Sequence, residues 1–295
     1  MNYILLHWNY GRISMKMVVE RMEQECNLIA RKNNGEWWHY SPESKQWTII
    51  SVPIGELISR KNNIINWGNH MYRNDGYFRL NKPSSIFLAS NKAESRIYLQ
   101  NHHIAVPKTE ILDNYVLLPV MNYPVIGRPP YHHAGKNFHV VENESAFTQF
   151  IKTIDLGWYF SEIFEKTHEF RVHCAHGKIL QVSDKPLVEG EIRANQAVTE
   201  ESWKALKWSE FNPKICEESL KAVEVLGLDY GAVDIMWNSK DNSVAICEVN
   251  TSPCITTEYS SGKYAAYFDW LIRHDFPAHF PIEGKSVFYN DILRS

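Results

Sequence analysis

Long apolar runs are missing from this sequence. No stretch approaches the roughly 18 residues needed to cross a membrane as a helix. The first residues, MNYILLHWNYGR, also lack a basic segment followed by a long apolar one. We therefore expect a cytoplasmic protein with no membrane segment and no targeting sequence.

Cysteine and charge of one sign are also scarce. The 295 residues include five cysteines, scattered and without a CxxC pair, which favours reduced thiols over disulfides. The formal net charge of -3 argues against a general nucleic-acid binder, which would need a strong basic field. His132, His133 and His139 have no cysteine or carboxylate at the usual zinc spacings, so a zinc site is disfavoured.

The chain does carry enough apolar residues for a sizeable core. Its 295 residues are 44% hydrophobic and 22% charged, which predicts a globular protein of two or three subdomains. Apolar periodicity and turn residues predict the elements of the first seventy residues: a strand at 3–8, a helix at 13–31, a hairpin at 36–50, a short helix at 53–61 and a strand at 64–67. A loop is predicted from residue 81, followed by a helix at 92–100 that Ser90 or Asn91 can cap.

Glycine is scarce in the loop that could cover phosphates. A strand predicted at 123–128 ends in Arg128 and leads into PPYHHAGKN, which contains a single glycine. This loop fails the GxxxxGK[ST] pattern, so a P-loop is excluded. Arg128 and Lys136 could still donate to phosphates in a closing flap, with His132 or His133 nearby. An ordinary surface loop explains the same residues.

A polar hairpin is predicted near the C-terminal end. Two apolar segments, 232–237 and 243–249, flank the turn residues NSKDN. Asp234 on the first strand can lie across from Glu248 on the second, and Asn250 points to the same face as Glu248. Two carboxylates and an amide oxygen suit Mg²⁺ that carries nucleotide phosphates. From spacing alone, an exposed hairpin with ordinary polar residues is an equally good interpretation.

A second hairpin is predicted at 169–175 and 178–183, joined by a His176-Gly177 turn. Glu169 and Arg171 lie on one of its faces. The following segment, EGEIRANQAV, offers Arg193 and Asn195. A guanidinium suits phosphate or carboxylate because it donates two hydrogen bonds at once. Taken one at a time, these charges are better explained by solvated strand edges or surface ion pairs.

In their order along the chain these pieces resemble the ATP-grasp superfamily, and within it the ribosomal-protein glutamate ligases. The resemblance covers residues 85–258. The matched pieces are Asn91-Lys92 opening a helix, the strand ending at Arg128, and the segments SEIF, EFRV, EGEIRAN, GAVDIM and CEVNTSP. It implies an α+β protein of ATP-grasp fold, with two α+β subdomains gripping ATP at 86–157 and 158–295. A small N-terminal α/β domain at 1–85 would precede them.

The resemblance also implies roles for the matched residues. ATP would be contacted by Lys92, Arg128, Glu162, Ile163, Phe164 and Glu169. Asp234, Glu248 and Asn250 would bind two Mg²⁺ ions, with Mn²⁺ as the alternative. Arg193 and Asn195 would face the γ-phosphate and the acyl phosphate, and Arg171 would belong to the same catalytic group. The chain departs from the family at Arg128, where a lysine is usual, but keeps the positive charge.

The activity implied by this resemblance is that of an ATP-dependent carboxylate-amine ligase. A carboxylate would take the γ-phosphoryl group of ATP, and an amine would then displace phosphate to give an amide. The partners would be a carboxylate and an amine substrate, each an amino acid, a peptide or a small metabolite. Two alternatives stay open: a kinase of the same fold, which would leave a stable phosphorylated product, and an ATP-binding module without catalysis.

Overall fold

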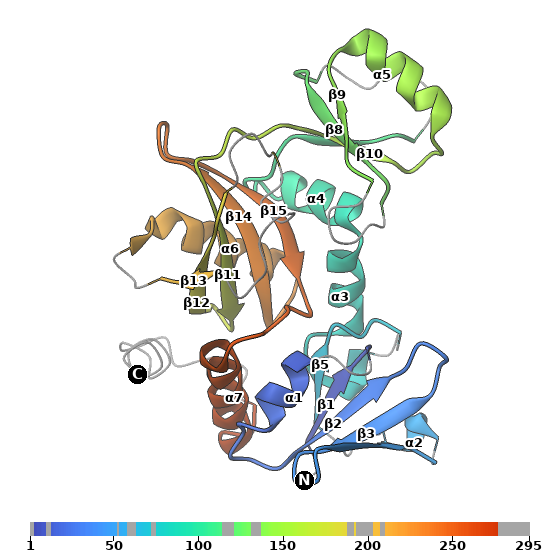
Figure 1. The fold of residues 1–295 in the computed structure, drawn as a ribbon, viewed down its shortest axis with the longest axis vertical. Helices are drawn as coiled ribbons and strands as arrows, with labels where there is room; N and C mark the ends of the chain where they lie inside the picture. Colours follow the sequence, from blue (N-terminus) through green and yellow to red (C-terminus); the bar gives the residue numbers. More distant parts are fainter. Residues whose placement is uncertain are drawn as a thin grey trace.

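Three sheets follow one another along the chain and lie in a row, with the third sheet in sequence between the other two (Figure 1). The computed structural model describes residues 3–9, 13–51, 53–57, 63–71, 75–113, 121–130, 137–187, 192, 203–206 and 210–276. No helix in these ranges is long and apolar enough to cross a membrane.

The N-terminal sheet has six strands in the order β4-β3-β2-β1-β5-β6. Its central strands β2, β1 and β5 are parallel, whereas β3 and β4 form the predicted antiparallel hairpin. Its elements are β1 (Tyr3–His7), α1 (Ile13–Val19), β2 (Cys26–Arg31), β3 (Trp37–Ser41), β4 (Gln46–Ile49), α2 (Ile54–Leu57), β5 (Asn63–Trp67), the short 3₁₀ helix Asp75–Tyr77 and β6 (Phe78–Leu80).

The helix predicted at 13–31 is wrong in its second half. Helix α1 ends at Val19, and the chain then forms strand β2, which pairs in parallel with β1. Most of β2 is buried, including Leu28, Ile29 and Ala30 in succession. A strand with both faces covered reads as a continuous apolar run, so its periodicity does not distinguish it from a buried helix.

Two helices, α3 (Pro83–Ser90) and α4 (Lys92–Asn101), lead out of the N-terminal sheet. The sequence predicted α4 correctly, and Asn91 caps it by accepting a hydrogen bond from the backbone of Glu94 at 3.3 Å. The loop predicted before it is wrong, because α3 occupies that segment. Proline at the first position of α3 is compatible with a helix, since its missing N–H would be unpaired there anyway.

The second sheet has four strands in the order β7-β10-β8-β9 and is covered by α5. Its elements are β7 (Thr109–Ile111), β8 (Val125–Arg128), β9 (His139–Val141), α5 (Glu144–Phe150), the 3₁₀ helix Ile151–Thr153 and β10 (Tyr159–Glu162). Strand β10 comes after the boundary predicted at 157 but pairs with β7 and β8. The division of the chain at 85 and 157 stays a prediction.

The third sheet has five strands in the order β13-β12-β11-β14-β15 and carries the residues of interest. Helix α6, which the sequence analysis did not predict, covers one face together with α3 and α4. The elements are β11 (His168–Ala175), β12 (Lys178–Lys185), β13 (Lys204–Ala205), α6 (Pro213–Val225), β14 (Tyr230–Asn238), β15 (Ser243–Asn250) and α7 (Glu258–Arg273).

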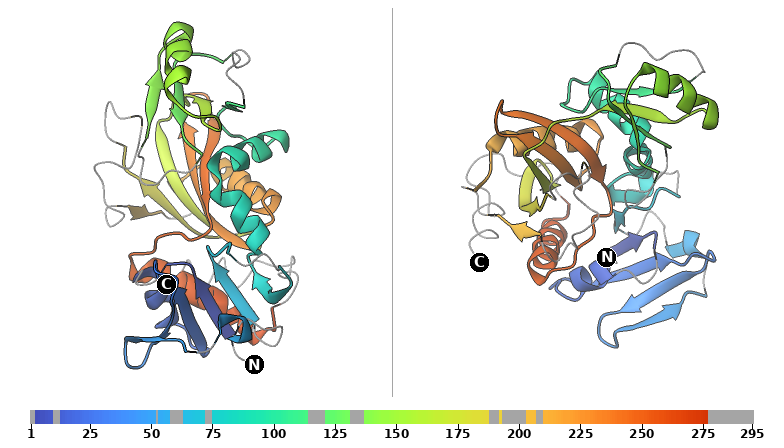
Figure 2. Two further views of the ribbon diagram at one scale, coloured as in Figure 1. Left: turned by 90° about the vertical axis from the view of Figure 1, so that its right-hand side faces the viewer. Right: turned by 45° about the horizontal axis from the view of Figure 1, so that its top comes forward.

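Helix α7 returns to the first sheet and packs between it and the third sheet. Figures 1 and 2 show it beside α1, and its Tyr264, Phe268 and Leu271 pack with Trp67 of β5. The apolar side of this helix therefore faces the first sheet. The segment just before α7 also touches the N-terminal unit, because a Cβ on Gly68 would lie 2.5 Å from Cβ of Ser252. The end of β15 is thus held against the first sheet.

Candidate active site

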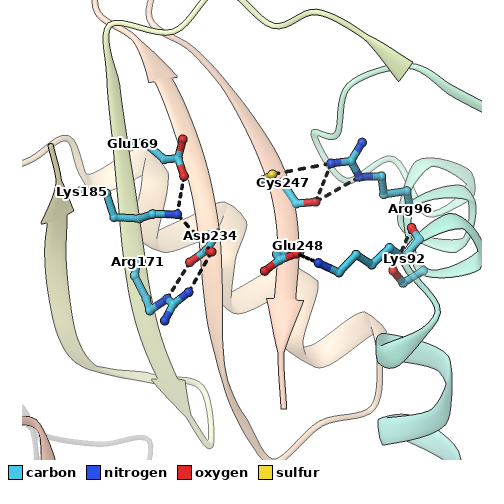
Figure 3. A network of polar contacts seen from close by, with 9 residues as sticks. Lys92, Arg96, Glu169, Arg171, Lys185, Asp234, Cys247 and Glu248 are labelled. Atoms are coloured by element: carbon cyan, nitrogen blue, oxygen red, sulfur yellow. Dashed lines mark hydrogen bonds and ion pairs between the residues drawn. The ribbon is translucent and has the colours of Figure 1, made fainter. Parts of the chain in front are cut away.

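The predicted polar hairpin is confirmed as β14 and β15, which pair antiparallel with Asp234 directly opposite Glu248. Asn250 lies two residues beyond Glu248, opposite Ala232. An irregularity in the register follows Asp234. Because β14 is central in the sheet and β15 is its edge, Asp234 also faces β11, whereas Glu248 is open to α4 (Figure 3).

Asp234 is buried and holds two cations. Arg171 of β11 binds it with both ends of the guanidinium, Nε to Oδ1 at 2.7 Å and a terminal nitrogen to Oδ2 at 3.0 Å. Nζ of Lys185 lies 3.1 Å from Oδ2. Burial by itself would raise the pKa of Asp234, but the charges of Arg171 and Lys185 outweigh it and hold that pKa well below its usual range. Asp234 is therefore a carboxylate at neutral pH.

Glu248 forms an ion pair with Lys92, the first residue of α4 (Figure 3). A cation at a helix N-terminus opposes the helix dipole, and the carboxylate of Glu248 compensates it. Burial raises the pKa of Glu248, and the charge of Lys92 outweighs this effect and lowers it. Lys92, predicted to contact phosphate, thus lies directly beside the predicted metal ligand.

A third carboxylate extends the cluster along β11. Glu169 binds Lys185 on β12, and its second oxygen accepts from Lys166 at 2.5 Å. The ring of Trp203 covers the other side, with the guanidinium of Arg171 at 4.5 Å and Nζ of Lys185 at 5.3 Å from its centre. Glu169 and Arg171 share one face as predicted. They connect the β14–β15 hairpin to the lysines of the cluster, Lys185 and Lys166.

Four residues at this site were not predicted from the sequence: Lys166, Lys185, Arg96 and Trp203. Lys185 lies opposite Glu169 in the β11–β12 register, so alternation along β12 was a usable signal. Arg96 follows Lys92 by one helical turn and donates to the carbonyl oxygen of Cys247 at 3.0 and 2.8 Å. Trp203 lies far from the cluster in sequence, and no local pattern indicates its position.

The other predicted site residues are only partly described. Arg128 ends β8, and its guanidinium lies 5.8 Å from the ring centre of Phe138. Glu162 ends β10 and accepts hydrogen bonds from the backbone and side chain of Asn122 at 3.0 and 3.1 Å. Ile163 and Phe164 follow it and are half-buried. Lys136, Arg193 and Asn195 lie outside the described residues, so their predicted roles stay predictions.

A cavity of about 140 Å³ adjoins Arg171 between the third sheet and the start of α7. Its floor follows the sheet through Arg171 and Ser183 to the opposed pair His173 and Gln181. Trp203 forms another wall, and the described residues that line the cavity include no carboxylate. The cavity shares Arg171 with the Asp234 cluster and is therefore next to it.

His173, in the wall of this cavity, should make the free energy of unfolding depend on pH. It is buried, it pairs with the hydroxyl of Tyr264 at 2.9 Å, and burial, aided by the charge of Arg171, lowers its pKa to about 3. The unfolded chain takes up the proton near its ordinary pKa of about 6.5, so stability from this group is fully present above that pH and is lost as the pH falls towards 3. We expect His173→Gln to remove a slope of up to about 1.4 kcal/mol per pH unit from the free energy of unfolding.

Urea unfolding of both proteins at a series of pH values below about 6.5 measures this slope. His102→Gln is the matched control, since His102 is exposed at the end of α4. Parallel pH profiles for the wild-type protein and His173→Gln would contradict the expectation.

Comparisons with known proteins identify the fold. No protein-family model matches the chain, and no curated protein matches it in sequence. Among solved structures, the VanG D-Ala:D-Ser ligase from Enterococcus faecalis aligns with a TM-score of 0.65 at 15% identity, covering 92% of this chain and 98% of that one. The D-alanine–D-alanine ligase from Coxiella burnetii aligns with a TM-score of 0.60 at 11% identity, covering 93% and 99%.

The D-alanine–D-alanine ligase from Bacillus anthracis in complex with ATP aligns with a TM-score of 0.59 at 15% identity, covering 92% and 97% of the two chains. These alignments span nearly the whole of both chains, so the likeness extends over the complete fold. The predicted fold class is confirmed: the chain is an α+β protein with the ATP-grasp fold, the fold of the D-alanine–D-alanine ligases.

Proposed function

We propose that this protein is an ATP-dependent carboxylate-amine ligase that forms an amide or peptide bond through an acyl phosphate. The observation that carries the proposal is the opposed pair Asp234 and Glu248, surrounded by cations from β11, β12 and α4. Structural relatives whose names describe them as ligases share this fold, and one of them is in complex with ATP. Acidic metal ligands beside phosphate-binding cations are what phosphoryl transfer requires.

The side chains present fit Mg²⁺ bound together with ATP. Asp234, Glu248 and Asn250 supply hard oxygen ligands, and Mg²⁺ usually takes one or two carboxylates and completes its shell with water and substrate phosphates. The terminal nitrogen of Asn250 is buried and has no hydrogen-bond partner among the residues that the structure describes, and the opposite amide orientation would present its oxygen to a cation. Among the described residues, no three His, Cys, Asp or Glu side chains gather around a metal position. In the proposed site, water and substrate phosphates would complete the shell.

Bound there, two Mg²⁺ or Mn²⁺ ions would neutralise the charge of the transferring phosphoryl group. The chain supplies the rest of the neutralisation, because Lys92, Lys185 and Arg171 point into the same cluster (Figure 3). We propose that Arg128, Lys136, Glu162, Ile163, Phe164 and Glu169 contact the nucleotide, and that Arg193 and Asn195 contact the transferred group. Their positions in the matched motifs support these roles.

In this reaction a substrate carboxylate oxygen attacks the γ-phosphorus, and the bond to ADP breaks. The nitrogen of an amine then attacks the acyl carbon, the bond to phosphate breaks, and the amine loses its proton. We propose that the cavity beside Arg171 holds one of the two substrates. Its volume of about 140 Å³ fits a molecule of amino-acid size, since pockets for drug-sized ligands run from roughly 300 to 1,000 Å³. A small amino acid is also what the ligases of the same fold act on, according to their names.

Mass spectrometry tests the proposal. The purified protein is incubated with Mg-ATP and a pool of amino acids and amines, and products are scored for the loss of one water on joining, with ADP and phosphate measured in parallel. An amide product with equimolar ADP supports the ligase. A stable phosphorylated product would instead indicate a kinase, and nucleotide binding without ADP release would indicate a binding module.

We also propose that the chain divides functionally into residues 1–85, 86–157 and 158–295 and works in the cytoplasm. The three sheets support this division only approximately, because β10 and α7 each pack with an earlier part of the chain.

A further inference from the structure

The two carboxylates proposed to hold metal already have protein cations as partners. Asp234 pairs with Arg171 and Lys185, and Glu248 pairs with Lys92. Glu169 and Lys166 extend the Asp234 network, so the ion-paired side chains of this site comprise, among the described residues, three carboxylates and four cations. These ion-paired groups carry a formal net charge of +1, although they include the ligands proposed for a divalent cation.

This charge balance decides which ligand the cluster attracts first. A divalent cation on its own meets a positive cluster and must compete with ammonium groups already placed on the carboxylate oxygens. The phosphates of ATP meet the same cluster as an anion and are attracted to it. The nucleotide, not the metal, is therefore the ligand that the cluster is arranged to receive.

We propose that Lys92 and Lys185 hold Glu248 and Asp234 until nucleotide phosphates take over these two ammonium groups, so that metal binds only together with nucleotide. Lys185 thereby becomes a residue that contacts the nucleotide directly. This inference rests on the proposed function, because it assumes that ATP is the ligand.

The geometry separates these two lysines from Arg171. A lysine ammonium is a single charge on a flexible stem, whereas the guanidinium of Arg171 is fixed on Asp234 by two bonds and lies against Trp203. The side chain of Lys92 is 24% exposed, so it has room to turn from Glu248 towards a phosphate. Nζ of Lys185 lies between Asp234 and Glu169, and it can leave the first while keeping the second. Arg171 remains on Asp234 throughout.

Mn²⁺ binding followed by electron paramagnetic resonance tests the proposal. Wild-type protein is titrated with Mn²⁺ alone and with an ATP analogue whose β–γ bridge is a methylene group. We expect Mn²⁺ to bind only in the presence of the analogue. Lys92→Met and Lys185→Met should each bind Mn²⁺ without nucleotide at least tenfold more tightly than wild type and bind the analogue more weakly. If the lysines had only a structural role, each substitution would weaken the binding of both Mn²⁺ and the analogue. Opposite changes in the two affinities therefore indicate that the lysines exchange a carboxylate for a phosphate.

Lys221→Met is the matched control, since Lys221 is an exposed lysine that pairs with Glu218 on α6, outside the cluster. It should leave Mn²⁺ binding without nucleotide unchanged. If Lys185→Met fails to fold, Lys92→Met carries the test, because its side chain is partly exposed.

Equal Mn²⁺ affinity of wild-type protein with and without the analogue would overturn the inference. So would an unchanged nucleotide-free affinity in Lys92→Met. Amide and ADP formation in the same preparation would show that the proposed function stands even so. Failure of the analogue to bind at all would overturn the inference and the proposed function together.

Discussion

Glu248→Gln is expected to reduce ADP formation by roughly a thousandfold, which corresponds to about 4 kcal/mol of transition-state stabilisation. The amide keeps the shape of the side chain but removes the negative charge that would offset a metal ion beside the phosphates. The fold should be unaffected, because the abandoned partner Lys92 is 24% exposed and water can solvate its ammonium group. A coupled assay for ADP and a thermal denaturation curve measure the two effects.

The matched control for this variant is Glu224→Gln, which makes the same chemical change on an exposed position of α6. It should alter neither ADP formation nor the midpoint of thermal unfolding. Unchanged ADP formation in Glu248→Gln would contradict the proposal that Glu248 binds the metal ion.

Asp234→Asn is expected to lower the free energy of unfolding by about 3–5 kcal/mol, as well as to remove ADP formation. Unlike Glu248, Asp234 is almost fully buried, and so are its partners: Asp234 and Lys185 are 3% exposed and Arg171 is 6% exposed. Removing the carboxylate charge leaves two buried cations with less compensation. For a chain of this size the loss corresponds to a fall of roughly 10 °C in the unfolding midpoint, which calorimetry measures.

A double variant tests the cause of this destabilisation. Asp234→Asn combined with Lys185→Met removes one of the two cations together with the carboxylate charge, and it should recover part of the lost stability. If Asp234→Asn unfolds at the wild-type temperature, the buried ion pairs do not contribute as the geometry indicates. The two variants should therefore differ in their effects. Glu248→Gln should lower activity alone, whereas Asp234→Asn should lower both activity and stability.

Local sequence patterns predicted those elements whose partners are close in the chain. The hairpins β3–β4, β11–β12 and β14–β15 were all predicted, because turn residues and alternation fix both strands and their register. Strand β2 was taken for a helix, because its pairing with β1 crosses α1 and its apolar residues fit either period. Helix α3 was missed because Pro83 and two serines favour a loop as readily as a helix start.

The opposition of Asp234 and Glu248 follows from the sequence alone, since a hairpin register depends only on residues within one short stretch of chain. The cations that pair with them follow from the packing of the whole chain. Lys92 is 156 residues from Glu248, and Arg171 is 63 residues from Asp234. Such pairs form because α4 packs against β15 and because β11 lies next to β14 in the sheet. Helix packing and the order of strands depend on burial over the whole chain, so no local spacing contains them, and the net charge around Asp234 and Glu248 follows from the fold.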